Sequence, residues 1–514
     1  MMKATLMAGI VGLAAASGAH AAGTTLNVGM ASADAGNLDP HVATTTPDKG
    51  LLHWMFNGLV RIKPGEASPG FIEPDIASSW TTSDDGLTWV FTLRDDVACH
   101  GDYGNLDAED VVFSIERAAN PDTSGFAKDF AALDSVEATG PYEVTITLSQ
   151  SVPSLLGLLV PYHGGNIVCK DAVEALGEDF KATPIGTGPF MFDEYQPQQY
   201  VKLVANPEYF RGEPKIKEIF YRYIPSDASR DLAFQAGEID MIYGRQDQTW
   251  VDRISEVPDT NVVVMKPGEM SVIHLNKSMA PLDDINVRKA VAHAIDRAAM
   301  TAFRGEAVTL PAVSPVPEGY LGFTDDVPTY EYSVDKAKEL LAEAGHPDGV
   351  TLKAIHTTLP GMLSTMEVVQ ALLREAGIDM EIETVEHATF HSQIRQDASQ
   401  VVHYSAARFP VADVYLTQFF HSDSTVATPT AVTNFSHCSV ADDDIVAARS
   451  ETDTAKQNAL WADAQRKIME DVCAIPIYQN LQLWAWKDNL DLGTDINGSL
   501  NLSPAITELA HFKE

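Results

Sequence analysis

The sequence is short of basic residues. Its 514 residues include 35 Lys and Arg against 72 Asp and Glu, which gives a formal net charge of −37 at pH 7. Nucleic acids and anionic lipid surfaces attract cationic proteins, so a chain of this charge would approach either of them against repulsion. We therefore expect neither nucleic acid nor an anionic membrane surface as a partner. The net charge does not identify a small-molecule ligand, because a ligand responds to the charges in its own site.

The sequence also lacks the common catalytic motifs. It has no Gly-x-Ser-x-Gly nucleophile elbow, no His-Glu-x-x-His helix, no Walker loop and no dinucleotide-binding fingerprint after its first strand. Among 72 acidic residues, chance pairs that resemble a glycosidase site are unavoidable. We expect the protein not to be an enzyme and to need no cofactor. A secreted hydrolase is the alternative from another class.

Long apolar runs are absent except near the start. Residues 1–21 hold a single charge, Lys3, ahead of an apolar run, and Ala19-His20-Ala21 has the small-x-small pattern of a cleavage site. This is typical of a secretory signal peptide, because the run is too short and too rich in Ala and Gly for a membrane span. No cysteine lies near the cleavage position, so no lipid anchor is indicated. We expect a periplasmic protein.

Cysteine is scarce, with four residues in the chain, Cys99, Cys169, Cys438 and Cys473. In an exported chain of this length, four cysteines are expected to form disulfides that reinforce a fold with its own core, not the framework of a small disulfide-rich protein. Three pairings of the four are possible. Zinc is disfavoured because no Cys-x-x-Cys spacing and no Cys-His cluster occurs. His387 and His391 have the i, i+4 spacing of helical ligands, but without His-Glu-x-x-His chemistry we predict no metal site.

The most informative stretch runs from Glu73 to Arg117. Within it, the turn Asp84-Asp85-Gly86 separates residues 80–83 from residues 87–93, which alternate aromatic and β-branched side chains, so we predict a β-hairpin. A helix follows, with Asp107 as its N-cap, acidic residues in its first turn and an apolar stripe. These patterns indicate structure but no function.

The same stretch resembles a signature of the family 5 extracytoplasmic solute-binding proteins, the dipeptide-, oligopeptide- and nickel-type receptors of ABC importers. The residues that match it in order are Ala77, Trp80, Ser83, Asp84, Asp85, Gly86, Leu93, Arg94, His100, Ala108, Glu109, Asp110 and Val111. Residues 184–190, Pro-Ile-Gly-Thr-Gly-Pro-Phe, match a second segment of that family. The resemblance implies an α/β, two-lobe periplasmic-binding-protein fold of type II, enlarged by an extra subdomain in the first lobe.

The resemblance covers essentially the whole mature chain and implies a discontinuous layout. We expect 24–267 and 487–514 to form lobe 1, with an inserted subdomain at about 60–185, and 268–486 to form lobe 2. Each cysteine pair then falls in one lobe, so Cys99–Cys169 and Cys438–Cys473 are the preferred disulfides. In lobe 2 we expect helices at 284–300, 333–344, 365–376 and 457–470, and strands at 351–356 and 380–384.

The function that the resemblance implies is that of a periplasmic receptor of an ABC importer. Such a receptor, expected here as a monomer, captures a peptide or peptide-like small molecule between its lobes and delivers it to an inner-membrane permease. A ligand that contacts both lobes stabilises the closed form, which the permease recognises. The alternative within this role is a non-peptide ligand: an opine-like anion, an oligosaccharide or a metal chelate.

The expected ligand-binding residues come from both lobes. Peptide-binding relatives place an acidic residue in a second-lobe loop, where it neutralises the α-amino group of the ligand, and that position aligns here with Arg408. A guanidinium can hold a carboxylate by two parallel hydrogen bonds, so we expect an anionic group on the ligand unless Arg408 is merely an exposed loop residue. The other candidates are Phe409, Ala406, Trp484, Asn57 and Thr187, with Phe409 and Trp484 as apolar walls.

Overall fold

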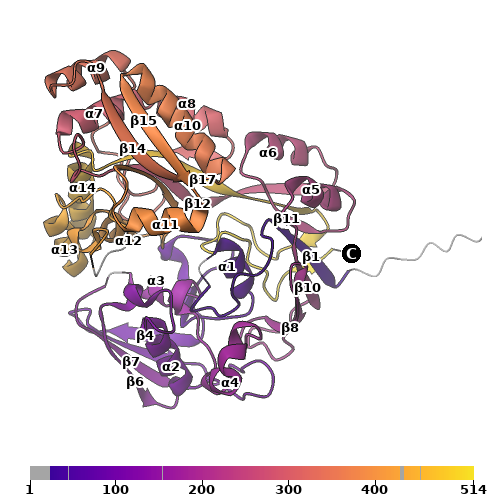
Figure 1. The fold of residues 1–514 in the computed structure, drawn as a ribbon. Helices are drawn as coiled ribbons and strands as arrows, with labels where there is room; N and C mark the ends of the chain where they lie inside the picture. The colour runs from indigo at the N-terminus through magenta and orange to yellow at the C-terminus, as the bar shows by residue number, and fades with distance from the viewer. Residues whose placement is uncertain (1–22, 44, 153, 429–432, 452, 514) are drawn as a thin grey trace, which may run out of the picture.

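The computed structural model describes residues 23–43, 45–152, 154–428, 433–451 and 453–513. The predicted signal peptide, residues 1–21, lies outside the described residues. No helix in the described part of the chain is long and apolar enough to cross a membrane. The chain folds into two α/β lobes, one drawn mainly in purple and the other mainly in orange and yellow in Figure 1. This arrangement confirms the predicted fold class.

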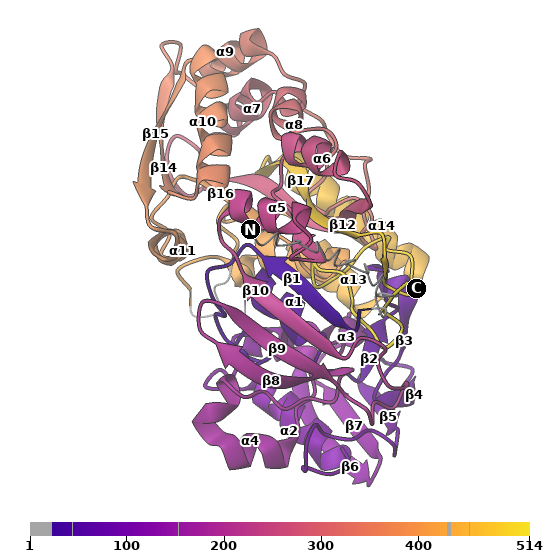
Figure 2. The ribbon, with the colours of Figure 1, turned by 90° about the vertical axis from the view of Figure 1, so that its right-hand side faces the viewer.

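One mixed sheet runs through both lobes. Its strands are β1 (Thr25–Met30), β8 (Phe190–Gln196), β9 (Tyr200–Ala205), β10 (Glu218–Tyr223), β11 (Met241–Tyr243), β12 (Thr260–Leu275), β13 (Thr309–Pro311), β14 (Val350–Thr357), β15 (Ile378–Val385), β16 (Val401–Ala406) and β17 (Ala474–Lys487). They follow the order β15-β14-β16-β12-β17-β11-β1-β10-β9-β8, and β13 pairs with β17 beside this path. Figure 2 shows β1, β10, β9 and β8 side by side in the first lobe. The strands from β11 to β8 thus belong to the first lobe and those from β15 to β16 to the second.

The strands β12 and β17 connect the lobes. They pair along most of their length, and the register shifts between Met265 and Glu269. Before the shift β12 lies in the first lobe, and after it β12 pairs with β16 of the second lobe. On β17, Trp484 already pairs with Tyr243 of the first-lobe strand β11. We therefore place the first crossover at 266–268 and the second at 480–482, a few residues ahead of the expected boundary at 486.

The inserted subdomain contains a four-stranded antiparallel sheet. Its order is β4-β5-β7-β6, with β4 at Ala77–Thr82, β5 at Thr88–Leu93, β6 at Leu133–Gly140 and β7 at Glu143–Leu148. The predicted hairpin is β4 and β5. The predicted helix is α2 (Ala108–Ala119), and Asp107 caps it by accepting hydrogen bonds from the backbone of Glu109 and Asp110, while the Asp110 carboxylate accepts one from the backbone of Asp107. Such a reciprocal capping box satisfies donors that a helix start leaves unpaired.

Shorter elements complete the first lobe. They are α1 (Thr46–Leu52), α3 (Leu155–Leu158), α4 (Lys170–Leu176), α5 (Asp227–Gln235), α6 (Gln248–Ser255), β2 (Val60–Ile62), β3 (Ile72–Pro74), β18 (Leu490–Asp491) and β19 (His511–Phe512). The strands β18 and β19 return the chain end to this lobe, since Leu492 and Phe512 are part of its core together with Trp54 and Trp484.

The second lobe carries most of the long helices. They are α7 (Ile285–Ala294), α8 (Arg297–Arg304), α9 (Val334–Glu343), α10 (Pro360–Glu375), α11 (His387–Arg395), α12 (Ala412–Phe420), α13 (Asp442–Ser450) and α14 (Thr454–Glu470). The prediction of one helix over 284–300 is wrong. Asp296 has an extended backbone, and its side chain caps α8 by accepting a hydrogen bond from the Ala299 backbone, so α7 ends before it. An Asp within a helical pattern is a potential N-cap, because its carboxylate competes for backbone donors.

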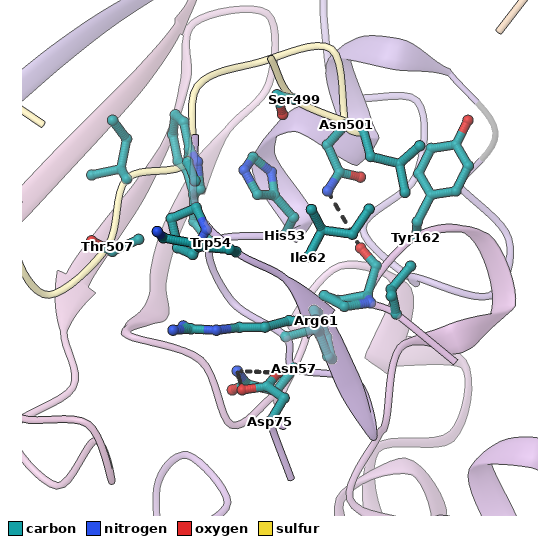
Figure 3. Close-up of a pocket in the computed structure, with 18 of the residues that line it drawn as sticks. His53, Trp54, Asn57, Arg61, Ile62, Asp75, Tyr162, Ser499, Asn501 and Thr507 are labelled. Carbon is teal, nitrogen blue, oxygen red and sulfur yellow. Dashed lines mark hydrogen bonds between the residues drawn. The ribbon is translucent and has the colours of Figure 1, made fainter. Parts of the chain in front are cut away.

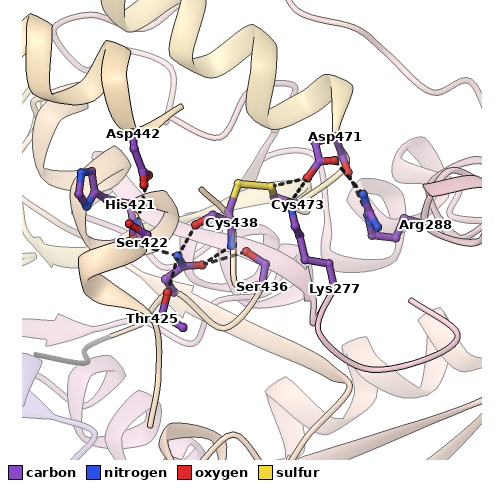
Figure 4. Close-up of a disulfide and its surroundings, with 11 residues drawn as sticks. Lys277, Arg288, His421, Ser422, Thr425, Ser436, Cys438, Asp442, Asp471 and Cys473 are labelled. Carbon is purple, nitrogen blue, oxygen red and sulfur yellow. Dashed lines mark hydrogen bonds and ion pairs between the residues drawn. A yellow bond between two sulfur atoms is a disulfide. The ribbon is translucent and has the colours of Figure 1, made fainter. Parts of the chain in front are cut away.

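Both disulfides have the pairing preferred from the sequence. Cys99 is bonded to Cys169 within the inserted subdomain, and Cys438 to Cys473 within the second lobe. Figure 4 shows the second bond beside Asp471, whose carboxylate lies 2.6 Å from Lys277 Nζ and 2.8 Å from Arg288 Nη2. The disulfide and these ion pairs together fasten the start of β17 to the surrounding loops.

Removing the second disulfide is expected to destabilise the protein. The Cys438→Ser/Cys473→Ser variant should lower the free energy of unfolding by ~3–4 kcal/mol, because the bond closes a long loop and constrains the unfolded chain. Urea denaturation of the oxidised wild type and of the variant measures this difference. Ser439→Ala, at an exposed neighbouring position, is the control and should stay within ~0.5 kcal/mol of the wild type. Equal midpoints, or four free thiols in peptide maps of the exported protein, would contradict the expectation.

Candidate ligand-binding cleft

A cavity large enough for a small molecule lies between the lobes. Its volume is about 570 Å³, and it is lined on the first-lobe side by residues 128–132 and by residues of the 150–164 segment. On the second-lobe side it is lined by Arg408, Phe409, residues of α12 and Arg449. The described part of the chain thus has an interlobe cavity large enough for a small molecule, since ligand pockets typically measure ~300–1,000 Å³.

Arg408 lines this cavity from the loop between β16 and α12. Its Nε donates to Gln418 Oε1 at 2.5 Å and its Nη1 to the Ala407 carbonyl at 2.9 Å, and the guanidinium carbon lies 5.2 Å from the centre of the Phe419 ring. Among the described residues, no carboxylate lies within ion-pair distance of Arg408. The guanidinium is therefore held in position and keeps hydrogen-bond donors for an anion in the cleft.

Phe409 packs between the lobes. Its side chain is 4 % exposed, and its ring covers Gly157 of α3, where an added Cβ would lie 2.0 Å from Cε1 of the ring. The core cluster that contains Phe409 joins Leu155 and Leu159 of the inserted subdomain to Tyr415 and Trp461 of the second lobe. Gly157 therefore allows the two lobes to pack against each other at the edge of the cleft.

Lys49 is a first-lobe cation next to a residue of the cleft. It lies on α1, and its Nζ is 4.8 Å from the centre of the Tyr162 ring, which lines the same cavity as Arg408. Burial and the charge of Arg408 lower the pKa of Lys49 to about 8. No described carboxylate pairs with it. Lys49 and Arg408 thus come from opposite lobes, and the charge of Arg408 affects the pKa of Lys49.

The acidic side chains of the cleft differ in their surroundings. Asp129 lies 3.4 Å from Nδ1 of His163, whose ring stacks on Tyr162. Burial lowers the pKa of His163 to about 4, so the imidazole is neutral at pH 7 and the contact is a hydrogen bond rather than an ion pair. Asp413 and Asp423 line the same cavity, and Asp413 lies 3.4 Å from Nε of Arg449. Another acid, Glu269, lines a neighbouring cavity of about 410 Å³.

Histidines gather in that neighbouring cavity. His387, His391 and His403 line it, and Nε2 of His387 lies 3.2 Å from Nε2 of His391. One group of three metal-ligand side chains was found among the described residues, Cys438, Asp471 and Cys473. Its two sulfur atoms are bonded to each other, so they are not available to a metal ion.

Two of the predicted site residues, Asn57 and Thr187, have side chains that form hydrogen bonds inside the first lobe. The Asn57 amide donates to both oxygens of Asp75, at 3.1 and 2.9 Å, and its oxygen accepts from the Thr187 hydroxyl at 3.2 Å. Figure 3 shows Asn57 and Asp75 at the side of a small first-lobe cavity of about 90 Å³. Both residues are buried, so they join two loops of the first lobe instead of facing the interlobe cleft. Their contact with a ligand stays a prediction.

Ala406 and Trp484 also lie outside the cleft lining. Ala406 ends β16, and its carbonyl accepts a hydrogen bond from the Tyr415 hydroxyl beside a small apolar void. Trp484 is completely buried in the first-lobe core, where its indole nitrogen donates to the Leu502 carbonyl at 3.0 Å. At this residue β17 has already entered the first lobe, and the role of Trp484 as an apolar wall of the ligand site stays a prediction.

Lys49, Tyr162 and Glu269 are among the residues in or near the cleft that were not predicted from the sequence. Lys49 stands at the start of an otherwise apolar segment, 50–52, and a lone charge at such a place is a signal that could have been used. Glu269 follows the expected boundary at 267, where both lobes meet. Tyr162 offered no comparable signal.

Comparisons with known proteins agree on one family. Residues 72–426 match the family described as bacterial extracellular solute-binding proteins, family 5 Middle. Heme-binding protein A of Haemophilus influenzae is 27% identical over 66% of this chain and 66% of its own length, and di/tripeptide-binding protein 2 of Pseudomonas aeruginosa is 26% identical over 85% of this chain and 86% of its own.

Solved structures give a more specific likeness. The structure of MoaA from A. tumefaciens R10 in complex with mannopinic acid is 47% identical, with a TM-score of 0.87, and the match covers 96% of this chain and 100% of that one. DppA of Helicobacter pylori in complex with the peptide STSA is 25% identical, with a TM-score of 0.81 and coverage of 96% and 99%. The two lobes, the interlobe cleft and the family match lead to one conclusion: the chain belongs to the bacterial extracellular solute-binding proteins of family 5, the substrate-binding components of ABC importers.

Proposed function

We propose that this substrate-binding protein takes up an acidic opine related to mannopinic acid, that is, an amino acid joined through its nitrogen to a sugar-derived chain. The observation that carries the proposal is the 47% identity, over 96% of the chain, to MoaA in complex with mannopinic acid. The peptide-binding relatives are much less similar, at 25–26% identity.

The charges of the cleft support an acidic ligand. Arg408 and Lys49 enter from opposite lobes, and neither has a carboxylate partner among the described residues. A carboxylate between them would offset both the burial of two cations and their mutual repulsion. The loop position that is acidic in the peptide receptors that this sequence resembles is Arg408 here. A simple dipeptide is therefore the second candidate, favoured by the peptide-binding relatives but not by this loop.

The arrangement of the lobes supports binding by closure. An acidic ligand held by Lys49 and Arg408 contacts both lobes and stabilises the closed form over the open one, in which the two cations are further apart. A ligand that binds the closed form more tightly than the open form is enough to tell the permease that the receptor is loaded. No bond has to be broken. The protein acts in the periplasm, as the predicted signal peptide indicates, and as a monomer that hands its ligand to an inner-membrane permease without turnover.

Calorimetric titration of the purified protein tests the proposal. Mannopinic acid should bind with a stoichiometry of one and should remain chemically intact, whereas a dipeptide should bind more weakly or not at all. Native mass spectrometry of protein purified without added ligand identifies any compound that is carried along. Tight binding of dipeptides without binding of mannopinic acid would overturn the proposal, and turnover of any bound compound would favour the hydrolase alternative.

A further inference from the structure

Two arginines of the second lobe line the interlobe cavity of about 570 Å³, Arg408 and Arg449. Both are held by side chains of α12, but these partners differ in charge. The Nε of Arg449 lies 3.4 Å from a carboxylate oxygen of Asp413, and its Nη2 donates to the Thr417 hydroxyl. The Nε of Arg408 donates instead to the side-chain amide oxygen of Gln418, at 2.5 Å. One arginine is therefore paired with an acid, and the other is held by a neutral group.

The chemistry of the two side chains determines how the Gln418 amide faces Arg408. A guanidinium has hydrogen-bond donors and no acceptor, so the amide must turn its oxygen toward Nε. This oxygen satisfies one donor of the guanidinium without adding charge. Gln418→Glu would keep almost the same shape, but the new carboxylate would offset the positive charge of Arg408. The residue type at position 418 therefore decides whether Arg408 presents a net charge to the cavity.

The loop that carries Arg408 is held by hydrogen bonds other than the one to Gln418. The Tyr320 hydroxyl donates to the Arg408 carbonyl at 2.8 Å, and the Tyr415 hydroxyl donates to the Ala406 carbonyl. Both tyrosines are buried. The backbone of the loop is thus fixed by its own contacts, and what Gln418 contributes is the position of the guanidinium.

Gln418 is itself held in place. It lies near the end of α12, and its backbone carbonyl accepts a hydrogen bond from the hydroxyl of the buried Thr433, at 2.9 Å. The guanidinium carbon of Arg408 also lies 5.2 Å from the centre of the Phe419 ring. Nη2 of Arg408 has no partner in the part of the chain that the structure describes. A positioned acceptor and an aromatic ring thus hold the guanidinium while Nη2 stays available to a group in the cavity.

We propose that Gln418 determines the preference of the cleft for an acidic ligand, as a positioning residue that acts through Arg408. Its neutral amide holds the guanidinium in one orientation and leaves the positive charge to be matched by a carboxylate of the ligand. The inference rests on the proposed function and adds to it the residue that sets which ligand charge is accepted. Arg449 does not make this selection, because Asp413 already offsets its charge.

Calorimetric titration of the purified protein with mannopinic acid tests the inference. Gln418→Glu should weaken binding by at least about 100-fold, because its carboxylate offsets the charge of Arg408 and repels the carboxylate of the ligand. Gln418→Met, which has a similar size and no charge, should weaken binding by less than about tenfold, because Arg408 loses a neutral acceptor but keeps its charge. Gln199→Glu adds the same charge at an exposed turn of the first lobe and should leave the affinity unchanged.

A double-mutant comparison shows whether Gln418 acts through Arg408. In the Arg408→Ala background, Gln418→Met should weaken binding by less than about twofold further, because no guanidinium is left to orient. A further loss as large as the loss that Gln418→Met causes in the wild type would show that Gln418 acts independently of Arg408. That result would overturn the inference.

The other outcomes separate the inference from the proposed function. If the wild type binds mannopinic acid and Gln418→Glu binds it equally well, the role of Gln418 is overturned while the function stands. The same holds if Gln418→Met loses as much affinity as Gln418→Glu, since the charge of the side chain is then irrelevant. If the wild type does not bind mannopinic acid, the proposed function falls and takes the inference with it. Thermal melting without ligand establishes that each variant is folded, and if Gln418→Glu does not fold, the double-mutant comparison decides the inference.

Discussion

Arg408→Ala is expected to weaken the binding of the acidic ligand by about 2 to 4 kcal/mol, or roughly 30-fold to 1,000-fold in Kd. The guanidinium is fixed by Gln418 and by the carbonyl of Ala407, so its free donors are already oriented toward the cleft. Its loss leaves the ligand carboxylate desolvated without its partner, and such a loss costs far more than the ~0–1 kcal/mol of a surface charge. Isothermal titration with mannopinic acid measures the change.

Two further variants distinguish geometry from charge. Arg408→Lys keeps the positive charge but cannot form two parallel hydrogen bonds, so it should recover only part of the affinity. Arg374→Ala, on an exposed arginine of α10, should leave the affinity unchanged. Unchanged affinity in Arg408→Ala, or a preference of the wild type for cationic ligands without an acid group, would show that Arg408 is an ordinary loop residue.

Gly157→Ala should impair ligand binding although residue 157 need not touch the ligand. An added Cβ would lie 2.0 to 2.4 Å from three atoms of the Phe409 ring, so the lobes could not pack as they do. Overpacking of this kind costs ~1–3 kcal/mol. Because this cost raises the free energy of the closed form relative to the open form, we expect the affinity for the ligand to fall by about 5-fold to 150-fold. Small-angle scattering should show a smaller ligand-induced decrease in the radius of gyration.

A double-mutant cycle shows whether the effect passes through Phe409. Phe409→Ala removes the ring, so Gly157→Ala should cost much less in that background than in the wild type. Gly70→Ala is the matched control, since the nearest atom to its Cβ would be 3.9 Å away. An undiminished effect of Gly157→Ala in the Phe409→Ala background would place its cause elsewhere in the first lobe.

Local structure was readable from the sequence wherever a short pattern determines it. The β4–β5 hairpin, the capping box at Asp107 and α9 and α14 fall where turn residues, caps and apolar spacing predicted them. The division between α7 and α8 was missed because Asp296 interrupts a pattern that otherwise continues. In that case a single side-chain hydrogen bond outweighed the helical periodicity.

The site was readable only in part, because it depends on which segments meet. Arg408 and Phe409, chosen by alignment of a loop with a family pattern, line the interlobe cavity, and their contact with a ligand stays a prediction. Asn57 and Thr187 stood in family-like segments, yet their polar atoms bind each other and Asp75. Lys49 and Glu269 are distant from Arg408 in sequence, and their electrostatic influence on one another arises from the way the two lobes fold together. A single sequence carries no direct record of such proximity.

The pairing of β12 with β17 has a mechanical consequence. Both connections between the lobes run next to each other and are hydrogen-bonded, so bending of the molecule is concentrated on one short axis near residues 266–268 and 480–482. Displacement grows with distance from an axis of rotation. When the lobes rotate about this axis, residues next to it move little, while the far ends of both lobes move the most. The remote surfaces, rather than the cleft, therefore display to a membrane partner whether the site is filled.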